Sequence, residues 1–169
     1  MPVTTRPMLP SDLDAVLRIQ AACYPPAMQE PGAIVLSRMT AACGTCLVAC
    51  IDDDDDDDDG VCGYLFAYPS RLGLVTDLGA PFRPATDANT LYLHDLALDA
   101  RAQGRGLARK LVDDALCLAR TMGLGHSALV SVQDSTRFWH ALGYRTTSTH
   151  DAGLHTYPPG AVYMVRTPA

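Results

Sequence analysis

Residues 101–112 read RAQGRGLARKLV, and the two glycines in this stretch constrain the fold more than any other feature. Gly104 and Gly106 open a helical pattern, although a glycine inside a helix costs about 1 kcal/mol relative to alanine. An extended pattern, LYLHDLALD at 91–99, comes just before them. A helix N-terminus exposes unpaired N–H groups and binds anions where side chains are absent. The stretch therefore predicts a strand, a phosphate-binding turn and a helix.

Three kinds of phosphate ligand compete for this turn. A Walker loop requires a lysine directly after a glycine, and Lys110 does not follow one. A dinucleotide fingerprint requires a third glycine where Arg109 stands, and an acidic residue about 20 positions later that is missing here. Coenzyme A is the third ligand, and Arg105, Arg109 and Lys110 supply positive charge beside its phosphates.

The remaining patterns predict a single α+β domain built around one mixed sheet. Apolar periodicity predicts helices that begin near Ser11 and Asp134, and strands follow from alternation and short buried runs. The expected helices are 11–24, 31–42, 104–123 and 134–143, and the expected strands are 4–9, 45–51, 61–69, 91–99, 127–132, 146–150 and 162–167.

Two segments between these elements are irregular. Residues 70–90 contain two glycines and two prolines and are long for a loop inside one domain, which is typical of functional loops. Residues 52–59 are eight consecutive aspartates, which we interpret as a solvated, mobile hairpin tip. Calcium binding is the less favoured alternative, because a uniform run has no glycine-shaped ligand loop.

Composition excludes several classes of partner. The chain has 169 residues, 13 basic and 19 acidic, and the aspartate run accounts for eight of the acidic ones. Because the rest of the chain is nearly neutral, we expect no nucleic-acid binding. No apolar run is long enough to cross a bilayer, and the first residues, MPVTTRPML, do not form a signal peptide. We expect a cytoplasmic protein without a membrane partner; a homodimer is left open.

Six cysteines are present, and Cys43 and Cys46 form a C-x-x-C pair that is compatible with a metal or redox site. However, Cys46, Val48 and Cys50 alternate along 45–51, so they share one face of a strand as small apolar residues. We therefore expect reduced core thiols and no metal.

The sequence resembles the GCN5-related N-acetyltransferase (GNAT) superfamily. RAQGRG fits that family's signature at Arg101, Gly104 and Gly106, and FWHALGY at 138–144 is similar to its F-Y-x-x-x-G-F segment. The order of elements agrees from residue 4 to residue 167. The resemblance implies a mostly antiparallel mixed sheet with helices on both faces, and a V-shaped splay between strands 91–99 and 127–132.

The resemblance also implies acetyl-CoA as the co-substrate. The backbone amides that would hold its diphosphate are those of Gln103, Gly104, Arg105, Gly106, Leu107 and Ala108. The strand edge at Leu96, Ala97 and Leu98 would pair with the pantetheine arm. Phe138 and Trp139 would line the coenzyme from the far side. Their helical spacing with Leu142 also fits plain core packing, which we favour for Phe138 and Leu142 and leave open for Trp139.

Acetyl transfer to an amine by direct attack, through a tetrahedral intermediate, requires a base and a proton donor for the departing thiolate. His94 is the candidate base, with a structural histidine as the alternative. LYLHDLAL is similar to a strand of the arylalkylamine N-acetyltransferases that carries two histidines, and Tyr92 replaces the first. The family's usual acid is a tyrosine where Trp139 stands, so Tyr157 is the candidate acid.

An acceptor pocket is expected between Tyr24 to Glu30, Tyr92 with His94, and Tyr157. Three aromatic rings favour a small aryl or alkyl amine, and Glu30 is a candidate to receive its charge, with a surface role as the alternative. Acetylation of a protein N-terminus or lysine, and non-catalytic acyl-CoA binding, are the alternative functions. A nucleotide-binding oxidoreductase is a more distant one.

Overall fold

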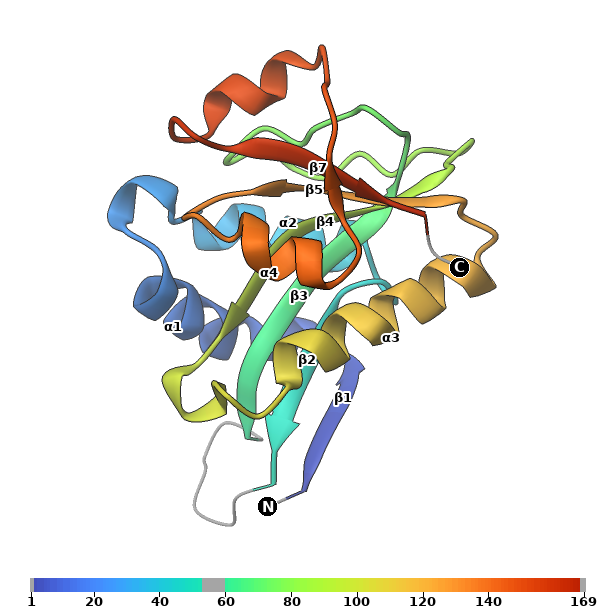
Figure 1. Cartoon of the computed structure of the whole chain (residues 1–169). Coiled ribbons are helices and arrows are strands. Elements are labelled where there is room, and N and C mark those ends of the chain that lie inside the picture. Colours follow the sequence, from blue (N-terminus) through green and yellow to red (C-terminus); the bar gives the residue numbers. More distant parts are fainter. Residues whose placement is uncertain (1, 53–59, 168–169) are drawn as a thin grey trace.

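A single sheet of seven strands runs through the computed structural model, which describes residues 2–52 and 60–167 (Figure 1). The strand order is β1-β2-β3-β4-β5-β7-β6, and every pair is antiparallel except β4 with β5. The strands are β1 (Val3–Pro7), β2 (Leu47–Ile51), β3 (Val61–Ser70), β4 (Thr90–Leu98), β5 (His126–Ser131), β6 (Arg145–Thr146) and β7 (Val162–Arg166). The mixed, mostly antiparallel sheet expected from the sequence is confirmed.

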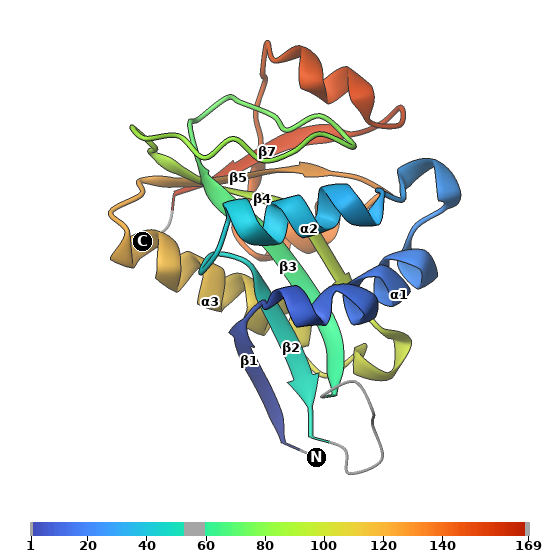
Figure 2. The ribbon, with the colours of Figure 1, turned by 180° about the vertical axis from the view of Figure 1, so that it is seen from behind.

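Helices cover both faces of this sheet, as expected. On one face lie α1 (Leu13–Cys23) and α2 (Gly32–Ala41), seen in front in Figure 2. On the other face lie α3 (Leu107–Thr121) and α4 (Thr136–Ala141). The core is accordingly split into two layers. Cys46, just before β2, and Val48 and Cys50 within it all belong to the layer under α1 and α2, which confirms that they share one face of the sheet.

None of the helices in residues 2–52 and 60–167 is long and apolar enough to cross a membrane. Of the aspartate run interpreted as a hairpin tip, all but Asp52 lies outside the described residues.

Helix α1 begins later than the sequence pattern predicts. Ser11 does not cap it, because Pro10–Asp12 form a 3₁₀ turn (η1) and the helix starts at Leu13. The Asp12 carboxylate accepts hydrogen bonds of 2.8 Å from the Arg6 guanidinium and from the Leu9 N–H. These contacts fix the turn and leave Asp12 at the cap position.

The C-terminal elements are also shorter than expected. Gln133 and Asp134 both adopt left-handed backbone, with φ of 52° and 56°, so α4 cannot begin at Asp134 and starts at Thr136. Of the strand expected at 146–150, only Thr146 lies in a strand, which is the two-residue β6 (Arg145–Thr146).

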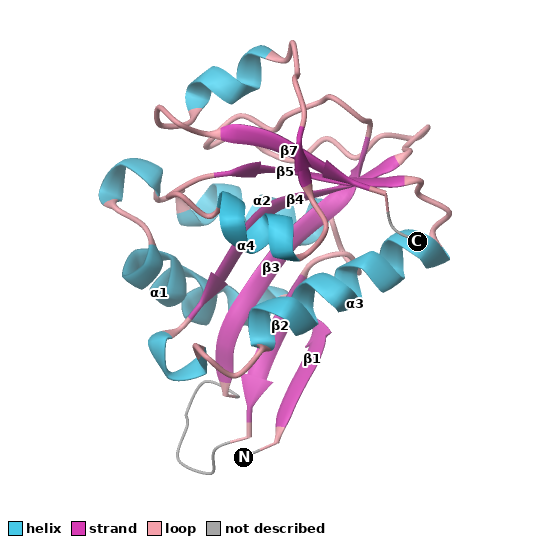
Figure 3. Ribbon diagram, in the orientation of Figure 1, coloured by secondary structure: helices cyan, strands magenta, loops and turns pink. Residues whose placement is uncertain are grey.

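The splay between β4 and β5 is present and forms the centre of the molecule (Figure 3). The two parallel strands pair from Thr90 with His126 to Leu93 with Leu129, and no further. Beyond Leu93 the strands diverge, so each has an unpaired edge facing the gap.

A β-bulge in β4 sits at the point where this divergence begins. Phe66 of β3 pairs with Asp95 and the next residue, Ala67, pairs with Leu93, so His94 is the extra residue. A bulge breaks the alternation of side chains. The Asp95 carboxylate accepts hydrogen bonds from Tyr24 and Tyr64 on the α1 and α2 side of the sheet. The neighbouring His94 side chain contacts Glu30 on the same side, so the bulge brings two consecutive side chains to one face.

The irregular segment that precedes β4 covers residues 71–89 and is tied to distant parts of the chain. The Gly73 N–H donates to the Tyr163 hydroxyl at 2.8 Å, and the Gly79 N–H donates to Glu30 Oε2 at 2.7 Å. The Val75 N–H donates to the Asp151 carboxylate at 3.0 Å. The segment therefore packs as an ordered cover over the end of the sheet that carries His94.

Candidate active site

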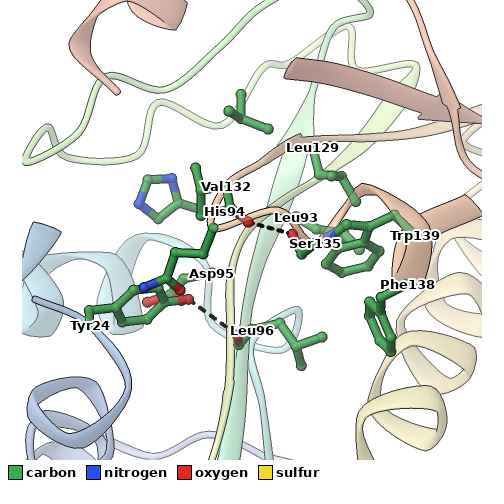
Figure 4. Close-up of a pocket in the computed structure, with 12 residues that line it drawn as sticks. Tyr24, Leu93, His94, Asp95, Leu96, Leu129, Val132, Ser135, Phe138 and Trp139 are labelled. Carbon is green, nitrogen blue, oxygen red and sulfur yellow. Dashed lines mark hydrogen bonds between the residues drawn. The ribbon is translucent and has the colours of Figure 1, made fainter. Parts of the chain in front are cut away.

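Three cavities follow the splay between β4 and β5. The vertex cavity, about 180 Å³, lies where the strands part and is shown in Figure 4. The edge cavity, about 400 Å³, runs along β4 toward the start of α3. The loop cavity, about 190 Å³, opens between the β5–α4 turn and the loop before β7. Gln133 lines all three, and Tyr24 and Leu96 line both the vertex and edge cavities.

The edge cavity exposes the unpaired edge of β4. The Asp99 N–H donates to the Cys62 carbonyl of β3, so the alternation of backbone groups along β4 turns those of Leu96 and Leu98 away from β3. The Leu96 carbonyl accepts a 3.2 Å hydrogen bond from the Tyr24 hydroxyl, and the Leu98 carbonyl accepts one of 3.2 Å from the Cys23 thiol. An extended ligand with amide groups can pair with this edge as a further strand would.

At its far end, the edge cavity reaches the start of α3 through Gln103 and Ala108. Gly104 and Gly106 have φ of 73° and 75°, and Gly106 is the left-handed residue that precedes the helix. A Cβ on either would meet nothing within 4 Å. Glycine is thus required here by backbone conformation, and the space beside it is open to a ligand.

Charged residues around this turn have different roles. Arg105 and Arg109 are exposed, next to the unpaired N–H groups of the first helical turn. Arg101 instead bonds the Asp99 carboxylate at 3.3 Å and the Val61 carbonyl at 3.1 Å. The signature arginine therefore anchors the turn to the sheet.

His94 belongs to a buried polar network on the α1 and α2 side. Its Nε2 lies 3.0 Å from Glu30 Oε1, and Glu30 Oε2 accepts a 2.6 Å hydrogen bond from Arg38. The Arg38 guanidinium also donates to the Ala80 carbonyl and lies over the ring of Phe82. Burial alone would raise the pKa of Glu30, but the hydrogen bonds from His94 and Arg38 outweigh it and lower that pKa to about 2.

On its other side, the imidazole faces Tyr157. The Tyr157 hydroxyl lies 3.5 Å from His94 Nδ1 and donates a 2.7 Å hydrogen bond to the Thr76 carbonyl. The His94 side chain is only 2% exposed, although its residue lines the vertex cavity. A water molecule or a movement of Tyr157 is therefore needed to connect the imidazole to an acceptor.

Three residues expected at the acceptor site do not line any of the three cavities among the described residues: Glu30, Tyr92 and Tyr157. Glu30 is buried and its carboxylate is fully engaged, so it is neither a surface residue nor free to receive a cationic amine. Tyr92 is 1% exposed inside the core layer. Tyr157 lies beside His94, outside the vertex, edge and loop cavities.

The aromatic residues of α4 also differ in part from expectation. Phe138 is 36% exposed and lines the vertex cavity, so the expectation of core packing is wrong for it. Leu142 is buried in the core, as expected. Trp139 packs in the core layer under α3 and also lines the vertex cavity.

The sequence patterns missed Asp95, Gln133 and Ser135, which all line the vertex cavity. Alternation along β4 places Asp95 opposite His94, and only the bulge brings both to one side. No sequence pattern marks Gln133 and Asp134 as functional residues. Their backbone conformation does, because left-handed non-glycine residues cost about 1–3 kcal/mol each and gather at functional sites.

Among the described residues, no group of three or more His, Cys, Asp or Glu side chains is placed to hold a metal ion. Cys43 is exposed and Cys46 is buried, so the C-x-x-C pair does not face one site.

Comparison with known proteins agrees with this geometry. The model of the acetyltransferase (GNAT) family matches residues 13–144. No curated protein matches the chain significantly. Among solved structures, Ard1 from Thermoplasma volcanium superposes with a TM-score of 0.75 at 19% identity, covering 100% of this chain and 99% of that one.

Two further structures share the fold at similarly low sequence identity. The PaiA N-acetyltransferase from Thermoplasma acidophilum, solved in complex with coenzyme A, has a TM-score of 0.68 at 14% identity and covers 99% of both chains. The ribosomal-protein-S18-alanine N-acetyltransferase from Escherichia coli has a TM-score of 0.68 at 13% identity, covering 99% of this chain and 95% of that one. At these identities the likeness establishes the fold.

Proposed function

Because the chain belongs to the acetyltransferase (GNAT) family, we propose that it transfers an acetyl group from acetyl-CoA to a primary amine. One observation carries the proposal: the edge cavity runs along the unpaired edge of β4 to Gln103 and Ala108, which flank the glycine turn. It adjoins the vertex cavity, with which it shares Tyr24, Leu96 and Gln133. The two ends of this path offer the groups that a diphosphate and a thioester require.

The chain's own residues fit the coenzyme along this path. The N–H groups at residues 103–108, with Arg105 and Arg109 nearby, would bind the diphosphate. The backbone of Leu96 and Leu98 would pair with the amides of the pantetheine arm. The thioester would then reach the vertex cavity, between β4 and the rings of Phe138 and Trp139.

His94 is the proposed base that takes the proton of the attacking amine. Glu30 holds its Nε2 and would stabilise the imidazolium that forms, while Arg38 keeps that carboxylate ionised. The imidazole is thereby held in one orientation, which a general base requires.

For the acceptor, we propose a small aryl or alkyl amine. The loop cavity has about 190 Å³ and is lined by Met28, Val132 and the apolar stretch 158–161, with Asp134 as its charged residue. Mostly apolar walls with one carboxylate, and the Gln133 amide beside it, suit an amine that carries a hydrophobic group. A protein N-terminus or lysine is the second candidate, because the ribosomal-protein-S18-alanine N-acetyltransferase, whose name states a protein acceptor, shares this fold.

Two measurements test the proposal. Calorimetry with CoA should show binding, and a thiol-release assay with acetyl-CoA should show turnover of amines such as tryptamine, phenethylamine and spermidine over peptides with free N-termini. Turnover confined to peptides would overturn the small-amine assignment, and absence of CoA binding would overturn the whole proposal.

The variant His94→Gln separates an enzyme from a protein that only binds acyl-CoA. Loss of a general base lowers kcat by about 10²–10⁴-fold. We expect that loss with CoA affinity retained. The exposed His155→Gln serves as the control and should keep wild-type activity.

A further inference from the structure

The proposed reaction has no assigned donor for the departing thiolate. Trp139 occupies the place of the family's usual tyrosine, and an indole N–H is not titratable in water. Tyr157 hydrogen-bonds the Thr76 carbonyl and does not line the vertex, edge or loop cavity. A donor must come from other groups along the path.

Tyr24 stands where that donor is needed. It follows α1 directly and lines both the edge cavity and the vertex cavity, together with Leu96. Its hydroxyl lies 3.2 Å from the Leu96 carbonyl, on the unpaired edge of β4 (Figure 4). A pantetheine arm that follows this edge into the vertex cavity brings its sulfur past this hydroxyl.

Asp95 lies directly behind Tyr24. Its Oδ1 accepts a 2.6 Å hydrogen bond from the Tyr24 hydroxyl, and its Oδ2 accepts one of 2.9 Å from the Tyr64 hydroxyl. No Lys or Arg side chain among the described residues pairs with this carboxylate. Burial raises the pKa of Asp95, which favours its protonated form.

We propose that Asp95 and Tyr24 form a proton relay that protonates the coenzyme thiolate; this inference rests on the proposed acetyl transfer. As the carbon–sulfur bond breaks, its electron pair stays on sulfur, and the Tyr24 O–H proton moves to that sulfur. When Asp95 is protonated, the hydrogen bond between the two groups reverses, so that the carboxyl donates to the Tyr24 oxygen and passes its own proton there as the phenol proton leaves. Tyr24 is restored, and Asp95 becomes the carboxylate that accepts from two phenols, until the proton that His94 takes from the amine is passed to it.

The relay explains why a phenol buried beside a carboxylate is suited to this step. Burial raises the pKa of Tyr24 well above its ordinary value, so a lasting tyrosinate is disfavoured. Passing a proton on while receiving another avoids that charge. The titratable groups that face Asp95 from the packed elements are Tyr24 and Cys23 of the α1 end, Tyr64 of β3, His94 of β4, Glu30, and Tyr157 of the loop before β7.

The test compares Tyr24→Phe with Tyr64→Phe in full-length protein. Both variants remove one hydrogen bond to Asp95, but only Tyr24 lines the cavities. With acetyl-CoA and the best acceptor of the amine panel, we expect Tyr24→Phe to lower kcat by roughly 10²-fold, the usual worth of a general acid, with the Kd for CoA unchanged. Tyr64→Phe should lower kcat by less than about tenfold, as expected for one lost hydrogen bond.

A pH profile and a rescue variant separate proton donation from a structural role. The wild-type kcat should fall on the alkaline side as Asp95 loses its proton, and this limb should be absent in Tyr24→Phe and in Asp95→Asn. Adding Trp139→Tyr to Tyr24→Phe places a phenol on the opposite wall of the vertex cavity and should restore at least part of the lost kcat.

Equal losses in the two tyrosine variants, or an alkaline limb that persists in Tyr24→Phe, overturn the relay while leaving acetyl transfer intact. A wild-type protein that binds no CoA overturns the proposed function itself. Calorimetry and kinetics therefore distinguish the two failures.

Discussion

Glu30, the only glutamate in the chain, holds together three segments that are distant in sequence. Its two oxygens contact Arg38 of α2, His94 of β4 and the Gly79 N–H of the irregular segment 71–89. The sequence shows that this glutamate is rare in the chain, but not that it is buried. Its burial depends on α2 packing over His94 on one face of the sheet.

Replacing Glu30 with Gln should destabilise the fold by about 3 kcal/mol at pH 7, because Arg38 is left buried without its partner. Since the pKa of Glu30 falls from 4.5 to about 2 on folding, its contribution is present above pH 4.5 and is lost as the pH drops toward 2. Urea unfolding across this range should show a weaker acid dependence in Glu30→Gln than in the wild type.

Asp87→Asn is the matched control, because Asp87 forms an exposed ion pair with Arg71. Such pairs contribute about 0–1 kcal/mol, so this variant should remain near wild-type stability. If Glu30→Gln were equally mild, the buried network would not be what fixes His94.

At the scale of elements, helix α3 was the most predictable, because its amphipathic pattern and Gly123 mark it in the sequence. The bulge at His94 was not predictable, since its residues alternate like those of a regular strand. The late start of α4 was not predictable from the sequence either, because glutamine rarely adopts the left-handed region and aspartate does so in only a minority of cases.

The glycine turn before α3 gives a prediction at this scale. Gly106→Ala should cost about 1–2 kcal/mol of stability, because alanine is strained at φ of 75°. Its methyl group should also enter the open space beside the turn and weaken CoA binding, measured by calorimetry.

Gly123 lies past the other end of the same helix, also with left-handed backbone, at φ of 73°, and with nothing within 4 Å of an added Cβ. Gly123→Ala should therefore cause a similar loss of stability with unchanged CoA affinity. Equal effects on affinity would place the diphosphate elsewhere.

For the whole molecule, the sequence resemblance was sufficient to predict the sheet, the helices on both faces and the splay, because these depend on the order of elements. It was not sufficient to predict the acceptor side. Tyr92 and Glu30 were expected at a pocket and lie in the interior, since the packing of residues 71–89 covers them.

Occupation of the splay should stabilise the whole fold, because the coenzyme would bridge β4 and the β5–α4 turn. At a CoA concentration 100 times its Kd, the gain is about 2.7 kcal/mol. For a chain of this size that raises the Tm by roughly 5–10 °C, measured by calorimetric or fluorescence melting.

Hydrogen exchange localises the effect. CoA should protect the amides of Leu96 and Leu98, whereas adenosine 3′-phosphate 5′-diphosphate, which lacks the pantetheine arm, should protect only the first turn of α3. Protection by CoA that is confined to α3 would show that the arm does not pair with β4.

The unpaired edge of β4 also bears on how the protein avoids self-association. Exposed strand edges are templates on which other chains aggregate. Here the edge lines the edge cavity, and the Cys23 and Tyr24 side chains each donate a hydrogen bond to one of its carbonyls, those of Leu98 and Leu96. These side chains hinder the docking of a foreign strand, while a slender, unbranched chain can enter the cavity, so the same opening that admits a small molecule guards against misassembly.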